Sequence, residues 1–556
     1  MKNSRLKSKL KSKWIIAALA GVTLVSVMAT TVKDNYFEVS KNLEIFATLY
    51  RELNIFYVDE VQPGDMMKTG IDAMLESLDP YTNYITESQI EDYQFMTTGQ
   101  YGGIGSLIRA VDGDVYISEP YEGFPADKAG LKAGDKILEI DGRPVQSKDQ
   151  EEISKMLKGQ SGSSLNVKYE REGIQSMATL KREEIKIPDV PYSGMLDEKV
   201  GYIRLTSFTQ TASQEVRDAF LELRDKQGMK ELIFDLRGNG GGLLREAVNI
   251  VNFFVPKGQE VVRTKGRIAE WDQKHTALSE PMDLNIPIVV LVDGSSASAS
   301  EIVAGALQDL DRAVIVGDRT FGKGLVQQTR DLQYNNKLKL TVAKYYIPSG
   351  RCIQKLDYSH KNIDGLAEEV PDSLLQAFET QNGRKVMDGR GIDPDVEVSL
   401  DEFPHILGSL LYENLFFKYA NEYVKTRPTI ASAREFHLTD ADYTAFTKYL
   451  EGKDYSYETD SEKELAELIK VAKKERYYGL AESEFNALTT ALTQKKNEDL
   501  ITFRSDIQEI LENEIVSRYH YQRGRVEASL AGDPAVKQAV IVLNDTDKYL
   551  FTLGKK

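Results

Sequence analysis

Three short segments of this chain combine small residues with side chains that can attack or activate a carbonyl group. They are DLRGNGGGL at 235–243, VDGSSASASEI at 292–302 and TFGKGLVQQ at 320–328. Glycines let backbone N–H groups point at an anion, and a serine between a strand and a helix exposes its hydroxyl. Desolvation lowers the pKa of a lysine and makes it a usable base. Together the segments favour acyl transfer by a serine enzyme.

The consecutive glycines of the first segment favour an oxyanion hole over a nucleotide site. A dinucleotide fingerprint needs its third glycine three positions after the second, whereas Gly240, Gly241 and Gly242 are adjacent. A phosphate loop needs Gly-Lys-Ser or Gly-Lys-Thr, which does not occur there. Backbone N–H groups at this turn would instead stabilise a developing oxyanion.

A serine cluster alone more often caps a helix than attacks a substrate, so Lys323 decides the interpretation. It stands between Gly322 and Gly324, next to apolar runs, where a surface charge has little use. None of the five histidines adjoins a glycine-rich strand end, which disfavours a Ser-His-Asp triad. The absence of His-Glu-x-x-His leaves a zinc protease unsupported. The single cysteine, Cys352, is a weak alternative nucleophile because no histidine partner is evident.

The elements that must position these segments are buried strands alternating with helices. Four apolar runs, at 201–205, 231–235, 288–292 and 313–316, predict a buried sheet in an α/β core over residues 186–400. Catalytic residues are expected on the loops that follow such strands.

Residues 99–185 are rich in β-type runs broken by glycines and resemble a PDZ domain. The resemblance rests on YGGIG at 101–105 and on GLKAGDKILEIDG at 130–142. In such domains the glycine loop captures a free terminal carboxylate and the peptide adds to a sheet edge. The resemblance therefore implies a tail-binding role for Gly102, Gly103, Ile104 and Gly105; the alternative is a turn in an unrelated β-barrel.

Helical patterns flank this region on both sides. Apolar residues at helical spacing predict a helical domain over residues 30–98, whose role is packing or dimer contact. Its last clear helix is expected to end near Leu78-Asp79-Pro80-Tyr81, where the proline stops it. Residues 401–556 predict an all-helical domain, with amphipathic stretches at 465–480 and 506–530. The predicted fold class is multidomain α+β: an α/β protease core with an inserted PDZ domain between N-terminal and C-terminal helical domains.

The first 29 residues predict export. Six cations without an acid precede an apolar run from Trp14 to Val27, which is typical of a secretory signal, with an uncleaved membrane anchor as the alternative. The formal net charge of −16 makes nucleic acid an improbable partner. One cysteine cannot form an internal disulfide, so a bacterial periplasm fits the exported chain better than an extracellular medium. If the N-terminal segment is not cleaved, the expected location is an inner-membrane anchor facing the periplasm.

The three chemical segments, with their spacing, resemble the C-terminal processing peptidases, also called tail-specific proteases. The likeness covers about Tyr36 to Val398 and weakens after Leu400. It implies that Ser298 is the nucleophile, that Lys323 is the general base and that Gln327 orients the lysine. It assigns one oxyanion donor to the Ala299 N–H and the other to Gly241 or Gly242. Ser296 and Ser300 are the rival nucleophiles.

The expected function is that of an exported serine endopeptidase that binds C-terminal tails of proteins and cleaves nearby. No metal or organic cofactor is implied, and the expected partners are peptide or protein substrates, a second copy of the chain or an adaptor. Two other classes compete: a silent PDZ scaffold and a retinoid binder sharing the α/β core. The scaffold has no use for Ser298, Lys323 and Gln327 together, and the retinoid binder is expected to lack them.

Overall fold

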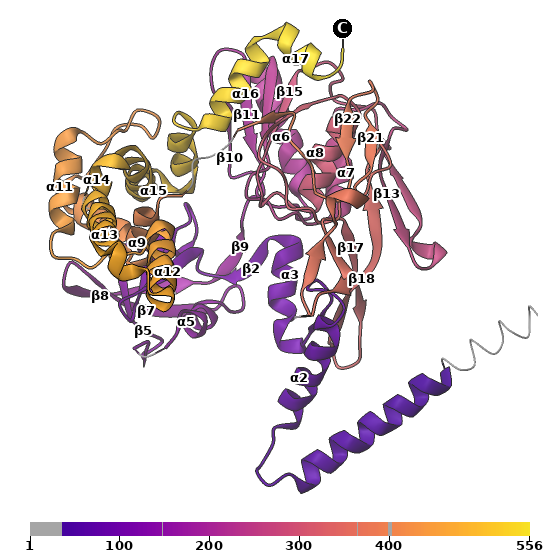
Figure 1. The fold of residues 1–556 in the computed structure, drawn as a ribbon, viewed down its shortest axis with the longest axis horizontal. Coiled ribbons are helices and arrows are strands. Elements are labelled where there is room, and N and C mark those ends of the chain that lie inside the picture. The colour runs from indigo at the N-terminus through magenta and orange to yellow at the C-terminus, as the bar shows by residue number, and fades with distance from the viewer. Residues whose placement is uncertain (1–35, 147, 364, 399–402, 497, 556) are drawn as a thin grey trace, which may run out of the picture. The chain divides into compact units, whose positions relative to one another are not determined.

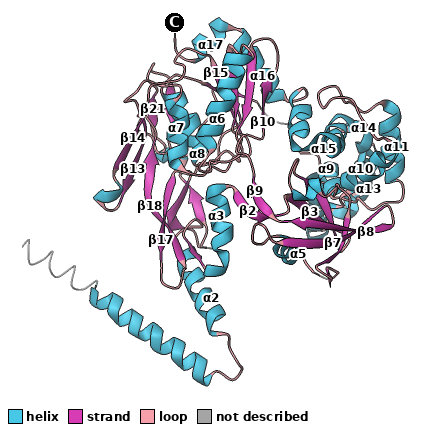
Figure 2. Cartoon of the chain, turned by 180° about the vertical axis from the view of Figure 1, so that it is seen from behind, coloured by secondary structure: helices cyan, strands magenta, loops and turns pink. Residues whose placement is uncertain are grey.

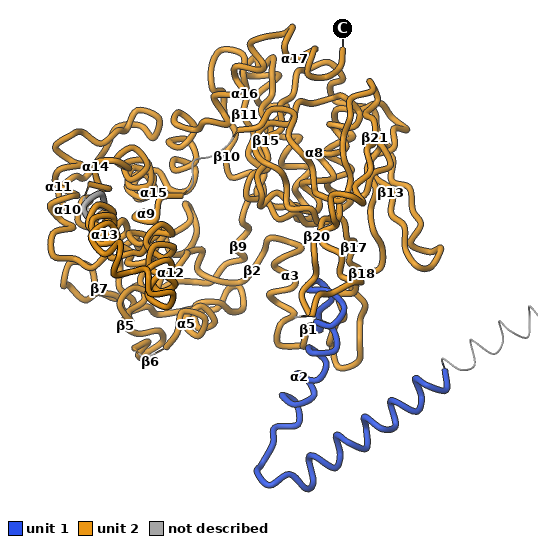
Figure 3. The backbone as a smooth tube through the Cα atoms, viewed as in Figure 1, with its two compact units in different colours: residues 1–84 blue, residues 85–556 orange. Residues whose placement is uncertain are grey.

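The computed structural model describes residues 36–146, 148–363, 365–398, 403–496 and 498–555. The predicted signal or anchor segment and the predicted boundary at 400/401 lie outside these ranges. The chain divides into two compact units, residues 1–84 and 85–556, shown in blue and orange in Figure 3. Within the described ranges, no helix combines the length and apolar character needed to cross a bilayer.

The first unit contains a helix at 36–56 and α2 (Pro63–Glu76). A helix ends near Pro80 as predicted, because α2 ends at Glu76 with Ser77 as its C-cap. It is not the last helix of residues 30–98, because α3 (Ile90–Thr98) follows. Many apolar side chains of the first helix are exposed, including Phe37, Leu43 and Leu49.

The larger unit is built on a six-stranded sheet in the order β10-β11-β12-β15-β16-β23. The four predicted apolar strands are confirmed as β11 (Val200–Arg204), β12 (Glu231–Asp235), β15 (Ile288–Val292) and β16 (Val314–Gly317). These four pair in parallel, β10 (Tyr192–Met195) is antiparallel to β11, and β23 (Val396–Glu397) is parallel to β16. Side chains alternate between the two faces of each strand, so both faces need cover.

Different parts of the chain cover the two faces of this sheet. One face packs on α6 (Ala212–Leu221), α7 (Leu244–Asn252) and α8 (Ala299–Asp309), with Phe234 and Val290 in that core. The opposite face, with Ile233 and Val289, packs on residues of α16 (Pro534–Asn544) and α17 (Thr546–Thr552). Figures 1 and 2 show α16, which is yellow in Figure 1, beside β15.

A second antiparallel sheet carries the segment that follows Lys323. In it, β18 (Lys337–Tyr346) pairs with both β17 (Leu325–Asp331) and β13 (Glu260–Gly266), and β13 pairs with β14 (Gln273–Thr276). The helix α3 (Ile90–Thr98) contacts this sheet through Tyr93, whose hydroxyl donates to Thr329 Oγ1 at 2.8 Å.

The predicted tail-binding region forms its own sheet in the order β3-β4-β5-β7-β8, with β6 (Arg143–Pro144) against β5. The strands are β3 (Ser106–Val111), β4 (Asp114–Pro120), β5 (Lys136–Ile140), β7 (Ser164–Arg171) and β8 (Ile174–Lys181). The helices α4 (Pro125–Lys128) and α5 (Gln150–Leu157) share its core. A two-stranded ribbon of β2 (Gln100–Gly103) and β9 (Glu183–Lys186) joins the domain to the rest of the unit.

The C-terminal region is helical, as predicted. Its own core involves α9 (His405–Tyr412), α10 (Leu415–Thr426), α11 (Asp440–Leu450) and the first half of α15 (Arg504–Leu530). The remaining helices are α12 (Asp460–Glu475), α13 (Glu482–Lys496) and α14 (Asp499–Thr502). The predicted helix at 465–480 ends earlier, at Glu475, because Arg476 is left-handed. Within α15, Tyr521 has a non-helical backbone that kinks the helix.

Candidate active site

Ser298 lies in a tight turn between the buried strand β15 and the helix α8. Its backbone has φ 55° and ψ −109°, a conformation that L-residues rarely adopt. Backbone strain of this kind is concentrated at functional sites. The turn is held by Asp293, whose carboxylate accepts the N–H groups of Gly238, Ser295 and Ser296 at 3.0–3.1 Å. Ser298 is half-buried, whereas the rivals Ser296 and Ser300 are fully buried and donate to carbonyl oxygens. Of these three serines, Ser298 is therefore the one whose side chain the turn leaves accessible.

Lys323 lies in the loop between β16 and β17, and its neighbouring glycines have a packing reason. A Cβ on Gly322 would stand 2.5 Å from Lys355 Cβ, and one on Gly324 would stand 2.8 Å from the Gln354 nitrogen. Only glycines let the chain at 354–355 approach this closely. Lys323 itself is half-buried. The two glycines thus allow the segment 354–355 to pack directly against the lysine loop.

The carboxylate of Glu301 joins the serine turn to the lysine loop, and sequence analysis assigned it no role. Its Oε2 accepts the N–H of Ser298 at 2.8 Å and that of Lys323 at 2.9 Å. Its Oε1 accepts the Gly322 N–H at 2.7 Å and the Thr320 hydroxyl at 2.6 Å. Burial raises the pKa of Glu301 to about 7, although these four donors favour its ionised form. The available signal was the Ser-x-x-Glu spacing from 298 to 301, which is that of a capping box.

Tyr345 provides a second link, which sequence analysis also missed. Its hydroxyl lies 2.5 Å from the Lys323 carbonyl oxygen and 3.1 Å from the Ser298 carbonyl oxygen. It lies on β18 and is fully buried. The serine turn and the lysine loop therefore contact one another through both a carboxylate and a phenol.

The structure separates the two glycines proposed for the oxyanion hole. A Cβ on Gly241 would lie 2.9 Å from both the Ala299 nitrogen and Ser298 Cβ, so Gly241 stands against the serine turn. A Cβ on Gly242 would instead meet the Phe208 oxygen at 2.4 Å. Ala299 is the first residue of α8, where backbone N–H groups lack helical partners.

The N–H of Gly241 is engaged by the side chain of Asn239, a third residue without a predicted role. It donates to Asn239 Oδ1 at 2.9 Å. Asn239 is fully buried, and its Nδ2 donates to the Leu205 oxygen at 2.9 Å. Its own carbonyl accepts the Ala297 N–H at 3.0 Å and the Ser300 hydroxyl at 2.8 Å. Asn239 therefore ties the glycine-rich loop to the serine turn.

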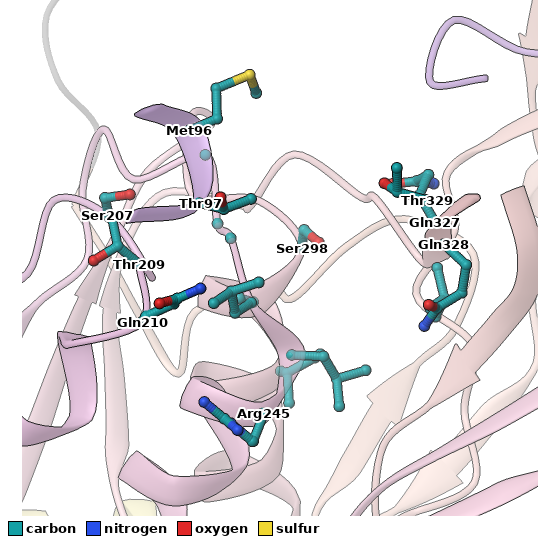
Figure 4. A pocket seen from close by; sticks show the side chains of 18 of the residues that line it. Met96, Thr97, Ser207, Thr209, Gln210, Arg245, Ser298, Gln327, Gln328 and Thr329 are labelled. Atoms are coloured by element: carbon teal, nitrogen blue, oxygen red, sulfur yellow. The ribbon is translucent and has the colours of Figure 1, made fainter. Parts of the chain in front are cut away.

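Gln327 lies on β17, where its Nε2 donates to Thr341 Oγ1 of β18 at 3.2 Å. Figure 4 shows it with Gln328 and Thr329 on one side of Ser298, while Thr97, Ser207, Thr209 and Gln210 lie on the other. All of these residues line one cleft of about 1110 Å³, together with Gly241, Gly242, Ala299 and Lys323. Apolar side chains such as Phe95, Leu244 and Ile302 form much of the rest of the lining. The cleft therefore combines apolar walls with a small number of polar groups, as binding sites do.

The predicted tail-binding loop lies in a different place, at the start of the β3 edge. None of its residues lines the cleft around Ser298. Gly102 accepts the Gly159 N–H, and a Cβ on it would meet the Gly159 oxygen at 2.1 Å. Gly105 has φ +69° and its carbonyl accepts the Tyr121 N–H at 2.9 Å. The four residues do not form a single loop as predicted, because Gly102 and Gly103 end strand β2 and pair with β9, and only Ile104 and Gly105 link β2 to the edge strand β3.

Three family models match the chain. They are described as "Peptidase family S41" over residues 199–360, "PDZ domain" over 116–171 and "Probable PDZ-protease, C-terminal helical domain" over 406–543. These matches fall on the sheet that carries Ser298, on the β3–β8 sheet and on the C-terminal helices.

Two curated relatives show similarity over most of their length. A "Probable CtpA-like serine protease" of Staphylococcus aureus (strain N315) is 33% identical over 363 residues, which are 63% of this chain and 72% of the relative. A "Carboxy-terminal-processing protease" of Bartonella bacilliformis is 35% identical over 353 residues, 61% and 80% of the two chains. Among solved structures, the "Photosystem II D1 C-terminal processing protease" is 28% identical, with a TM-score of 0.35, over 65% and 93% of the two chains.

Proposed function

The chain belongs to the carboxy-terminal-processing proteases of peptidase family S41, and from this we propose that Ser298 and Lys323 are its nucleophile and general base. The observation that carries the proposal is the shared Glu301 Oε2, which holds the N–H groups of both residues at 2.8 and 2.9 Å. A carboxylate that fixes two backbones at once reduces the motion between nucleophile and base, and such positioning lowers the activation barrier.

The proposed reaction proceeds through an acyl-enzyme. Neutral Lys323 Nζ accepts the proton of Ser298 Oγ while that oxygen attacks the scissile carbonyl carbon. The protonated lysine then donates to the leaving amine, and the peptide C–N bond breaks. A water molecule, deprotonated by the same lysine, hydrolyses the ester and restores the serine. Gln327 would orient the lysine amine during both steps.

The Ala299 N–H and the Gly241 N–H are the proposed donors to the tetrahedral oxyanion. Gly241 is favoured over Gly242 because its α-carbon stands against Ser298. Its N–H would exchange Asn239 Oδ1 for the substrate oxyanion, which is a stronger acceptor.

Cleavage of an unfolded protein tests the proposal. The chain from residue 30 onwards and its Ser298→Ala form are incubated with unfolded casein, and new N-termini are identified by mass spectrometry. The expected result is cleavage by the parent only. Equal cleavage by both forms would remove Ser298 from the mechanism.

We further propose that the PDZ domain binds the free C-terminus of a substrate at Gly102, Gly103, Ile104 and Gly105. The loop leads directly into β3, an edge strand to which a peptide can add. A free carboxylate supplies both charge and hydrogen-bond acceptors, so amidating a peptide's C-terminus should weaken its binding in calorimetry. Binding that ignores amidation would contradict this assignment.

Export to the periplasmic side of the membrane is also a proposal, supported by the cationic prefix and apolar run of residues 1–29. Cell fractionation separates the alternatives. Full-length protein in the cytosol would contradict export, and a membrane pellet would favour the uncleaved anchor.

A further inference from the structure

The glycine-rich loop that carries Gly241 is connected to the C-terminal region by a half-buried ion pair. Arg237 Nη1 donates to Asp533 Oδ1 at 3.0 Å, and Nη2 lies 2.7 Å from Asp533 Oδ2. Only 17% of the arginine side chain and 15% of the aspartate side chain are exposed. Bidentate arginine–carboxylate pairs of this kind fix geometry as well as charge.

Arg237 is fixed at its other side by Asp235, the last residue of β12. Its Nε and Nη2 donate to that carboxylate at 3.0 and 2.6 Å, and its backbone N–H donates at 2.9 Å. Asp235 is fully buried and also accepts the Tyr202 hydroxyl at 2.6 Å. The guanidinium thus lies between two carboxylates, one from the sheet and one from the C-terminal region.

The loop leaves Arg237 directly toward the reaction site. Gly238 donates to Asp293, which holds the serine turn, and Asn239 follows with its bond to the Gly241 N–H. A shift of Arg237 would therefore move the proposed oxyanion donor relative to Ser298.

Asp533 is itself held rigidly. It is the N-cap of α16, and its Oδ1 accepts the N–H groups of Ala535 and Val536 at 2.9 and 3.1 Å. Buried side chains of α16, including Val536 and Val542, pack on the face of the sheet formed by Val289 and Leu291. Asp533 is therefore a fixed point against which Arg237 can be oriented.

The chain preceding Asp533 contacts the PDZ domain. Beyond the kink of α15, the Tyr521 hydroxyl donates to Asp127 at 2.8 Å, and Arg525 pairs with the buried Glu119 at 3.0 Å. One stretch, residues 521–533, thus touches the PDZ domain at one end and the glycine-rich loop at the other.

We infer that Asp533 is a positioning residue for the peptidase reaction, acting through Arg237 on the loop that supplies the oxyanion-hole glycine. The C-terminal helical region is then part of the catalytic apparatus, and residues 521–533 connect that apparatus to the PDZ domain. The inference rests on the proposed role of Gly241 in the reaction.

Asp533→Asn tests the inference, with Asp545→Asn as the matched control. Asparagine retains an oxygen for capping, so α16 keeps its N-cap while the negative charge that faces Arg237 is lost. Asp545 caps α17 through the Lys548 N–H at 3.0 Å and does not contact Arg237. Asp533→Asn should lower kcat by about ten- to a hundredfold with KM changed by less than about twofold, because misplaced oxyanion donors affect the transition state. Affinity for a peptide boronate that adds to Ser298 should fall in parallel, and the Asp545→Asn enzyme should match the parent.

Amide hydrogen exchange supplies a readout that needs no activity. Exchange of residues 237–242 should accelerate by about tenfold or more in Asp533→Asn and remain unchanged in Asp545→Asn. Should Asp533→Asn fail to fold, Asp533→Glu, which keeps the charge at a longer reach, should show the same shift to a smaller degree. If the parent enzyme shows no Ser298-dependent cleavage while amide exchange is faster in Asp533→Asn, the proposed function is contradicted and the contact between Asp533 and the loop is not. An active parent whose Asp533 variants retain kcat and loop protection would overturn the inference.

Discussion

The backbone N–H groups of Ser298 and Lys323 donate to the same oxygen atom, Glu301 Oε2, at 2.8 and 2.9 Å. The two residues are 25 positions apart in the sequence, in loops that follow different strands. Because a single buried carboxylate holds both loops, the charge on that carboxylate controls the geometry of the pair.

Activity should fall as the pH drops through about 7, the value to which burial raises the pKa of Glu301. All four groups around the carboxylate are donors, so protonation introduces a fifth hydrogen without an acceptor. The effect on stability has the opposite sign. A carboxyl whose pKa is higher in the folded state stabilises the fold at low pH, and this contribution is lost as the pH rises from about 4.5 to about 7. Profiles of kcat/KM and of unfolding free energy against pH should therefore diverge over this interval.

Glu301→Gln should lower kcat/KM by about a hundredfold, since an amide NH₂ would face at least two of the four donors. The residual activity should no longer decline near pH 7. A decline that persists in the variant would assign that titration to Lys323 instead.

Lys323→Arg should be nearly inactive, because arginine keeps the charge but does not lose its proton near neutral pH. The same follows for Lys323→Ala, and combining either change with Ser298→Ala should reduce kcat little further, since residues that act as one unit are not additive. Lys344→Arg is the control, because Lys344 is exposed on the neighbouring strand β18. Full turnover by Lys323→Arg would show that the lysine is not the base.

Gly241→Ala should reduce kcat by more than about a hundredfold while Gly240→Ala retains most of the activity. The backbone at Gly241 has φ +99°, and a Cβ there would lie 2.7 Å from the Ala297 oxygen. A Cβ on Gly240 meets nothing within 4 Å. Burst titration of active sites checks that the two variants contain equal amounts of folded enzyme. Similar kcat values for both would contradict the close approach of Gly241 to the serine turn.

Gln150→Ala should tighten the binding of long C-terminal peptides by about threefold, the net value of one or two exposed hydrogen bonds. The Gln150 side chain occupies the free edge of β3: its Nε2 donates to the Ile108 oxygen at 3.1 Å and its Oε1 accepts the Ala110 N–H at 3.2 Å. A peptide that adds to this edge must displace it, whereas a tripeptide ending at the glycine loop need not. Calorimetry with three- and eight-residue peptides measures the difference.

Glu151→Ala is the control for the Gln150 change, because Glu151 is the next residue of α5 and its carboxylate pairs with Lys155. Equal effects of Gln150→Ala on short and long peptides would show that the tail does not extend along β3.

The sequence was sufficient to predict four of the six strands of the main sheet and the crowded loop at Lys323, because both depend on local patterns. Continuous apolar runs identify buried strands, and a lysine between glycines identifies a crowded loop. The roles of Glu301 and Asn239 depend on which backbone groups meet in space, and their residue types alone do not reveal this.

The contact between Arg237 and Asp533 was equally beyond sequence analysis, because the two residues are 296 positions apart. The stretch at 534–544 was predicted as part of a separate helical domain. In the structure it packs on the sheet instead, through Ala535, Val536 and Ala539. Its apolar pattern fits either partner, so periodicity alone could not choose between them.

Because α16 and α17 cover one face of the sheet, the order of synthesis determines when the enzyme can fold into its active form. The strands β11, β12, β15 and β16 leave the ribosome long before residues 534–552, and until then the face bearing Val289, Leu291 and Val316 lacks its partner. An apolar sheet face of this kind is not stable in water, so the core cannot complete its fold on a partial chain. A protease of this design therefore acquires cutting activity only after residues 534–552 have been made and have packed on the sheet, well after the strand that precedes Ser298 has been made.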